Sequence, residues 1–128
     1  MIIKYLIILY SLLLIGLGQT SDIDSRPIKA WIEMEGEMSN LRLTAKLQNL
    51  GSKIINLDYI LKTRKDGRSG HSSTVQKGKV ICEKLSILSL SESRINLSPN
   101  NNLIVSLKVY HNNLLIAQDS VVLHGDNH

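Results

Sequence analysis

Apolar and polar residues alternate along most of the chain between residues 28 and 123. Such alternation is typical of β-strands that bury one face and expose the other. It predicts clear strands over residues 28–35, 41–48, 53–64, 103–110 and 114–123, and weaker ones over residues 69–76, from Val80 and Cys82, and over residues 87–96. No window carries an apolar stripe of helical period over three turns. The pattern therefore predicts an all-β fold, a single immunoglobulin-like antiparallel β-sandwich of about seven strands.

Turn residues separate these predicted strands. Asn and Gly fill residues 49–51, and residues 97–100 and 111–113 have similar turn compositions. Asp66-Gly67 is a dipeptide that favours a tight hairpin, so residues 69–76 are expected to return beside residues 53–64 as the fourth strand.

The start of the chain differs from this central region. Lys4 precedes an uncharged apolar run from Tyr5 to Leu17, and small residues follow, as in a signal peptide. We expect residues 1–18 to be cleaved after Gly18, or alternatively after Thr20. An uncleaved membrane anchor is the other reading, although the run is shorter than the roughly 20 residues that span a bilayer. The expected organisation is a lead-in over residues 19–27, the sandwich domain over residues 28–124 and a tail over residues 125–128.

The composition after residue 18 limits how the core can be built. Only Trp31, Tyr59 and Tyr110 are aromatic, and Phe is absent, so the core must consist of Ile, Leu and Val, which suits packed sheets. Cys82 is the single cysteine, so no disulfide can form within the chain. We expect Cys82 to be a small buried apolar residue, with a reactive or intermolecular thiol as the alternative.

Residues 64–78, with the sequence RKDGRSGHSSTVQKG, interrupt the apolar alternation, because Val75 is their only aliphatic residue. The excess positive charge gathers in the same region. Residues 53–84 hold eight basic and three acidic residues, a net charge of +5, whereas residues 19–52 and 85–128 each carry a net charge of −1. Such a patch steers acidic partners toward itself. The segment is either a solvated hairpin tip or a polar strand kept for a partner.

No catalytic or ligand-binding constellation is visible in the sequence. The four histidines, His71, His111, His124 and His128, lack the close spacing of metal ligands. There is no glycine-rich strand-to-helix loop for a nucleotide and no nucleophile elbow for a catalytic serine. The small positive excess and the few aromatic residues are a poor match to nucleic-acid binding. We therefore expect no catalytic residue, no metal and no cofactor, and a binding protein rather than an enzyme.

The order of the sequence features resembles that of one known family. The apparent signal peptide and two alternating strands precede the pattern Arg64-x-x-Gly67-x-Ser69-Gly70-x-Ser72-x-Thr74-x-Gln76, which is followed by Leu- and Ser-rich strands, Leu97-Ser98-Pro99 and a final hairpin. Over nearly the whole chain after residue 18, this order is similar to that of the curli assembly proteins CsgC and CsgH. The CsgC branch carries a Cys-x-Cys pair, whose matching place here is Ile55-Asn56-Leu57. The missing pair sets a redox role aside and favours the CsgH branch.

The resemblance implies a periplasmic immunoglobulin-like sandwich that binds curli-type amyloid subunits and holds them in a non-amyloid state before secretion. We expect a monomer without nucleic acid and, after signal cleavage, without a membrane span. The polar segment and its basic flanks are the expected client-binding residues, namely Lys62, Arg64, Lys65, Arg68, Ser69, Ser72, Thr74 and Gln76. The alternative is an exported β-sandwich interaction module, or an accessory protein of an envelope complex, without anti-amyloid activity.

Overall fold

The computed structural model describes residues 27–68 and 70–125. The predicted signal peptide (residues 1–18), nearly all of the predicted lead-in and the last three residues of the predicted tail lie outside these ranges. Those predictions stay predictions. Among the described residues, no helix is long and apolar enough to cross a membrane.

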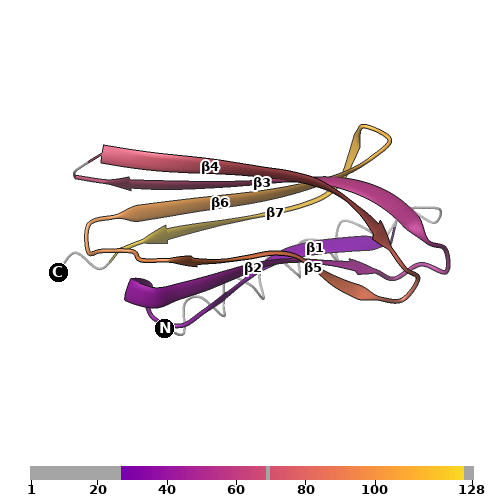
Figure 1. The fold of residues 1–128 in the computed structure, drawn as a ribbon, viewed down its shortest axis with the longest axis horizontal. Coiled ribbons are helices and arrows are strands. Elements are labelled where there is room, and N and C mark those ends of the chain that lie inside the picture. The colour runs from indigo at the N-terminus through magenta and orange to yellow at the C-terminus, as the bar shows by residue number, and fades with distance from the viewer. Residues whose placement is uncertain (1–26, 69, 126–128) are drawn as a thin grey trace.

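Two antiparallel sheets pack face to face and form the predicted β-sandwich (Figure 1). One sheet has the strand order β1-β2-β5 and the other has the order β4-β3-β6-β7. A single turn of 3-10 helix, η1, precedes β2. The described elements are β1 (Ile28–Glu35), η1 (Met38–Asn40), β2 (Leu41–Asn49), β3 (Ile55–Gly67), β4 (Gly70–Cys82), β5 (Ile87–Ile95), β6 (Asn102–His111) and β7 (Leu114–His124).

The core between the sheets is aliphatic, as the composition requires. Alternate residues of β1, β2, β6 and β7 point inward and interdigitate, while their neighbours face solvent. The most deeply buried large side chains include Ile32, Leu47 and Leu107. Cys82 is fully buried at the end of β4, which confirms the prediction of a buried apolar cysteine. Burial of such side chains stabilises by about 1.5–3 kcal/mol each, so the sandwich stands without a disulfide.

Two details of the central hairpin differ from the prediction. β3 does not turn at Asp66-Gly67 but continues through both residues, with Asp66 opposite His71 and Gly67 opposite Gly70. The connection therefore lies between Gly67 and Gly70, later than predicted. A physical reason is visible on the strand, where the Arg64 guanidinium donates to the Asp66 carboxylate at 3.0 Å and supports the extended backbone.

The second difference is the length of β4. Val80 and Cys82 do not start a new strand, because β4 runs without interruption to Cys82 and pairs with β3 along its whole length. Gly78 does not end the strand. The ring of Tyr59 on β3 occupies the space that a side chain at Gly78 would fill. A Cβ at Gly78 would lie 2.6 Å from Tyr59 Cε1. The pairing register, rather than the local sequence, thus decides the length of β4.

β5 reads as irregular in the sequence because it contains a bulge. Its register against β2 shifts between Ala45 and Lys46, so Ser91 pairs with Ala45 and Ser89 with Lys46. An extra residue in one strand breaks the period of two without breaking the sheet.

The buried Asp119 carboxylate joins the two sheets along one side of the sandwich. Oδ2 of this β7 residue accepts a hydrogen bond from the Ile32 amide of β1 at 2.9 Å, and Oδ1 accepts one from the Ser120 amide at 2.9 Å. The Ile32 amide belongs to an edge strand, so the carboxylate takes the place of a neighbouring strand. Asp119 is 8% exposed, and its loss would leave the Ile32 amide without this acceptor.

Asp119→Ala is expected to lower the free energy of unfolding by about 1–3 kcal/mol, because a buried backbone donor loses its partner. Urea unfolding followed by circular dichroism measures the change. Glu92→Ala, which removes an exposed carboxylate on β5, is the matched control and should cost less than about 0.5 kcal/mol. Equal stability of the two variants would contradict the role of Asp119.

Candidate functional site

β4 is a long edge strand with one unpaired side. It pairs with β3 over thirteen residues and, among the strands that the structure describes, has no neighbour on its other side. Its first eight residues, Gly70–Lys77, are exposed on both faces of the sheet. Figure 1 shows β4 as the outermost strand of its sheet, running from the hairpin tip toward the connection with β5, where the two layers approach each other. The strand therefore offers free backbone donors and acceptors next to a polar surface.

The inner face of β4 carries a row of short polar side chains. Ser72, Thr74 and Gln76 are opposite Lys65, Thr63 and Leu61 of β3, and Leu61 points into the core. Paired residues share a face of the sheet, so the three polar side chains point to the inner side. All three are exposed because the three-stranded sheet does not cover them. We call Ser72, Thr74 and Gln76 the polar row.

A hydrogen bond joins the polar row to the other sheet. The Ser91 hydroxyl of β5 donates to Gln76 Oε1 at 2.6 Å. Toward the hairpin tip, the Lys65 ammonium donates to the Asn96 carbonyl oxygen at 3.2 Å, which links β3 to the segment after β5. These polar contacts replace apolar packing at this side of the sandwich and leave it open to a further polar chain.

Tyr59 and Gly78 mark the boundary between the open and the covered parts of β4. The Tyr59 ring lies against Gly78, and its hydroxyl donates to the Leu90 carbonyl oxygen at 3.4 Å. Beyond this point Val80 is half-buried and Cys82 is fully buried. The strand is thus anchored at one end and uncovered at the other.

The structure divides the predicted client-binding residues between two faces. Lys62 and Arg64 both lie on the outer face of the four-stranded sheet, whereas Lys65 lies on the inner face with the polar row. Arg68 lies at the hairpin connection, and Ser69 lies outside the described residues. The described members of the predicted set therefore do not share one face of the sheet. An acidic partner on the outer face would not contact Lys65.

The outer face of the four-stranded sheet carries surplus positive charge. By the pairing register, its described residues include two carboxylates, Asp58 and Asp66, and five cations. Asp66 binds Arg64, and Asp58 lies 3.9 Å from the Lys79 ammonium. The five cations of this face are Lys62, Arg64, Lys77, Lys79 and Lys108.

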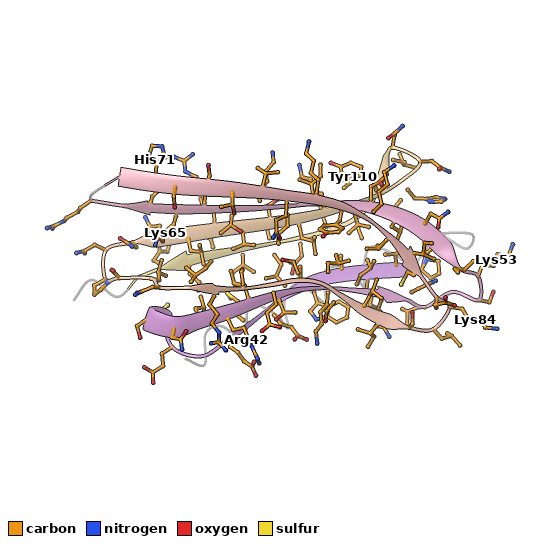
Figure 2. All side chains as sticks on the ribbon, viewed as in Figure 1. Arg42, Lys53, Lys65, His71, Lys84 and Tyr110 are labelled. Carbon is orange, nitrogen blue, oxygen red and sulfur yellow. The ribbon has the colours of Figure 1, made fainter. Side chains whose placement is uncertain are left out.

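The outer face of the three-stranded sheet is more nearly balanced, because by the pairing register it holds four cations (Lys29, Arg42, Lys46 and Arg94) against three carboxylates, each of which lies in an ion pair. Arg42 forms an ion pair with Glu35 and lies 3.7 Å from Glu92, and Lys46 lies 3.2 Å from Glu33. Figure 2 shows Arg42 and His71 on opposite sides of the sandwich. Surplus charge that can attract an anion is therefore concentrated over β3, β4 and β6.

Three of these cations, Lys77, Lys79 and Lys108, were not predicted from the sequence as site residues. Lys77 and Lys79 belong to the basic middle third of the chain, and their odd numbers match those of the outward-facing β4 residues. The alternation of the strand could therefore have placed Lys77 and Lys79 on its outer face. Nothing in the sequence pointed to Lys108, because it lies beside the other cations only through the pairing of β6 with β3, where it is opposite Ile60.

The groups that the site presents are suited to binding another chain. Within the described residues, no three side chains among His, Cys, Asp and Glu gather where they could hold a metal ion. The buried Cys82 thiol lies 3.7 Å from the Ser86 hydroxyl and is shielded from solvent. What the site offers is a free strand edge, hydroxyl and amide groups, and a cationic face.

Comparisons with known proteins identify the fold. No family model matches the chain, and no curated protein matches it. Among solved structures, the E. coli curli protein CsgC matches with a TM-score of 0.64 and 13% sequence identity, over 73% of this chain and 96% of that one. CsgH of R. palustris matches with a TM-score of 0.55 and 16% identity, over 72% and 90% of the two chains. The chain has the fold of CsgC and CsgH, as the resemblance implied.

The same sandwich occurs in larger proteins. A β-glucuronidase of Bacteroides uniformis matches with a TM-score of 0.53 and 9% identity, over 77% of this chain but only 14% of the enzyme. The TM-score is higher for CsgC than for CsgH, so the preference for the CsgH branch rests on the missing Cys-x-Cys pair alone. At these identities the comparisons establish architecture, and function has to be argued from the surface.

Proposed function

We propose that this protein is an exported, periplasmic chaperone-like protein that binds curli-type amyloid subunits and inhibits their fibril formation before secretion. The fold shared with CsgC and CsgH makes a role in curli assembly the natural reading. The anti-amyloid activity is argued from the surface of the chain itself.

The observation that carries the proposal is the uncovered half of β4. An amyloid fibril grows when a new chain pairs with an unpaired strand edge. Gly70–Lys77 presents such an edge, and the polar row gives it the Ser, Thr and Gln side chains that match a Gly-, Ser- and Gln-rich client. A client segment that pairs with β4 is withheld from the growing fibril end.

The cationic outer face supplies attraction over a longer distance. Five cations against two carboxylates on one sheet face give an acidic client a favourable approach to β4. Such steering raises the association rate more than it raises the final affinity. This suits a protein that must meet its client before a fibril nucleus forms.

The second candidate function is a plain interaction module of the cell envelope. The β-glucuronidase match favours it to the extent that this sandwich also serves as one part of a protein with a different activity. In that case the polar row would be a solvated part of the connection between strands and would bind no client.

The central test is thioflavin fluorescence of a curli subunit in the presence of the protein at well below equal molarity. The proposal expects a longer lag before fibril growth, because each molecule can pair repeatedly with different client segments. A lag unchanged from that of the subunit alone would favour the interaction module.

Thr74→Lys tests whether strand pairing is required. A lysine on the inner side of an edge strand discourages the addition of another strand. We expect about a ten-fold higher concentration to be needed for the same lag, which corresponds to about 1.4 kcal/mol. The substitution adds positive charge, so capture by charge alone would instead leave inhibition unchanged or improve it. Ser73→Lys on the outer face is the matched control and should retain inhibition.

The double substitution Lys62→Glu/Arg68→Glu tests the steering. It should slow client capture by about three-fold or more at low salt and have less effect at high salt, where charges are screened. Lys53→Glu/Lys84→Glu changes the net charge equally at the end of the sandwich far from His71, as Figure 2 shows, and serves as control. Fibrillation assays with both variants measure the effect. Equal losses would show that only net charge matters.

A further inference from the structure

A shallow hollow lies on the outer face of the four-stranded sheet, away from the polar row. It has a volume of about 570 Å³ and is lined mainly by apolar surface. Ile60 and Tyr110 form its apolar part, and both are half-buried. We call it the Tyr110 hollow. Its lining residues are Asp58, Tyr59, Ile60, Lys77, Gly78, Lys79, Tyr110 and Asn113.

Cations border the Tyr110 hollow. Ile60 is paired with Lys77 of β4 on one side and with Lys108 of β6 on the other. Neither lysine has a carboxylate within ion-pair distance among the described residues. Lys79 lies 3.9 Å from Asp58, but its side chain is 90% exposed. Their aliphatic stems can line the apolar surface while the ammonium groups stay in water.

The β6–β7 turn gives the hollow a defined rim. Asn112 and Asn113 have φ angles of 51° and 67°, the left-handed conformation that a tight hairpin turn requires. The His111 ring nitrogen Nδ1 lies 3.0 Å from the Asn56 carbonyl oxygen of β3, which ties the turn to the sheet. Figure 2 shows Tyr110 on the outer side of the four-stranded sheet, near this turn.

We propose that the Tyr110 hollow binds an aromatic side chain of an acidic polypeptide segment. An aromatic ring fits an apolar depression beside a tyrosine and gains both burial and ring contact there. Carboxylates next to it in the segment would face Lys77, Lys79 and Lys108, which together outnumber Asp58. The hollow is concave, so it accepts a protruding side chain better than a flat anionic lipid surface. The proposal rests on the proposed function only for the source of the segment.

Short fluorescein-labelled peptides test this directly. One contains Asp-Tyr-Asp within a Gly/Ser sequence, and the others carry Asn-Tyr-Asn or Asp-Ala-Asp in its place. Fluorescence anisotropy should show that both replacements weaken binding by about ten-fold, because each removes one half of the recognition. Amide chemical-shift changes on adding the Asp-Tyr-Asp peptide should centre on Ile60, Lys77, Gly78 and Tyr110. Changes centred on the polar row would overturn the proposal.

Protein variants distinguish binding at the hollow from attraction by net charge. Lys77→Glu/Lys79→Glu should weaken the Asp-Tyr-Asp peptide by about ten-fold or more, whereas Lys53→Glu/Lys84→Glu, with the same net charge, should weaken it far less. Tyr110→Thr should weaken it without any change of charge, in a protein whose circular dichroism spectrum is unchanged. Equal weakening by the two charge variants, or tight binding to anionic lipid vesicles with none to the peptide, would overturn the proposal.

The thioflavin assay keeps the two proposals distinguishable. If the unmodified protein leaves the lag unchanged, the proposed function fails, while peptide binding still decides whether the hollow is a site. If the unmodified protein extends the lag and Lys77→Glu/Lys79→Glu extends it equally, the curli subunit is not the source of the segment that enters the hollow, while the strand pairing of the proposed function stands.

Discussion

The hydrogen bond from the Ile32 amide to the Asp119 carboxylate ties the edge strands of the two sheets together at one side of the sandwich. It holds the β1 edge of the three-stranded sheet against β7 of the four-stranded sheet. Strands in a sheet are about 4.8 Å apart, so alignment at one side leaves about one strand width uncovered at the other. β4 is the strand left uncovered, and Gly70–Lys77 is exposed on both faces as a result. The candidate site is therefore a consequence of strand number and of one buried carboxylate.

Short length, bulges or proline can keep an exposed edge strand from pairing with another chain, but β4 has none of these features. It is long, contains no proline, and pairs with β3 in unbroken register. Protection comes from side chains, which are polar on the inner face of Gly70–Lys77 and include Lys77 and Lys79 on the outer face, beside the exposed Val75 and Ile81. Two β4 strands from separate copies would bring these lysines near each other and repel. An acidic client meets no such repulsion. This arrangement of charges is what supports the proposed function over the interaction module.

Much of the fold could be predicted from the sequence, because a period of two records which face of a strand is buried. The all-β class follows from it, whereas the aliphatic core follows from the composition and the burial of Cys82 from the usual place of free cysteines in proteins. The length of β4 could not be predicted, since it depends on pairing with β3 and on the Tyr59 ring that fills the space beside Gly78. The bulge in β5 likewise results from pairing with β2.

The candidate site was predictable only in part, for a related reason. Composition located the polar segment, but alternation along β3 places the neighbours Arg64 and Lys65 on opposite faces, and only the packing of the two sheets decides which of the two faces inward. The Tyr110 hollow was not predictable at all. It brings together residues from three strands and a turn that are up to 55 positions apart in the chain, as the contact between His111 and Asn56 illustrates.

The positions of the two surfaces constrain how one client could use both. A client strand paired with β4 would lie one strand spacing beyond it, and Ile60 lies one spacing on the other side, so about 9.6 Å would separate the client backbone from the hollow. An aromatic side chain is shorter than that distance. The residue that enters the hollow must therefore belong to a segment that crosses the sheet face, not to the paired strand. Lys77 and Lys79 border both surfaces, so a segment held in the hollow would bring its neighbours along the chain close to the free edge. Capture on the outer face followed by pairing at the edge is the order that this geometry favours.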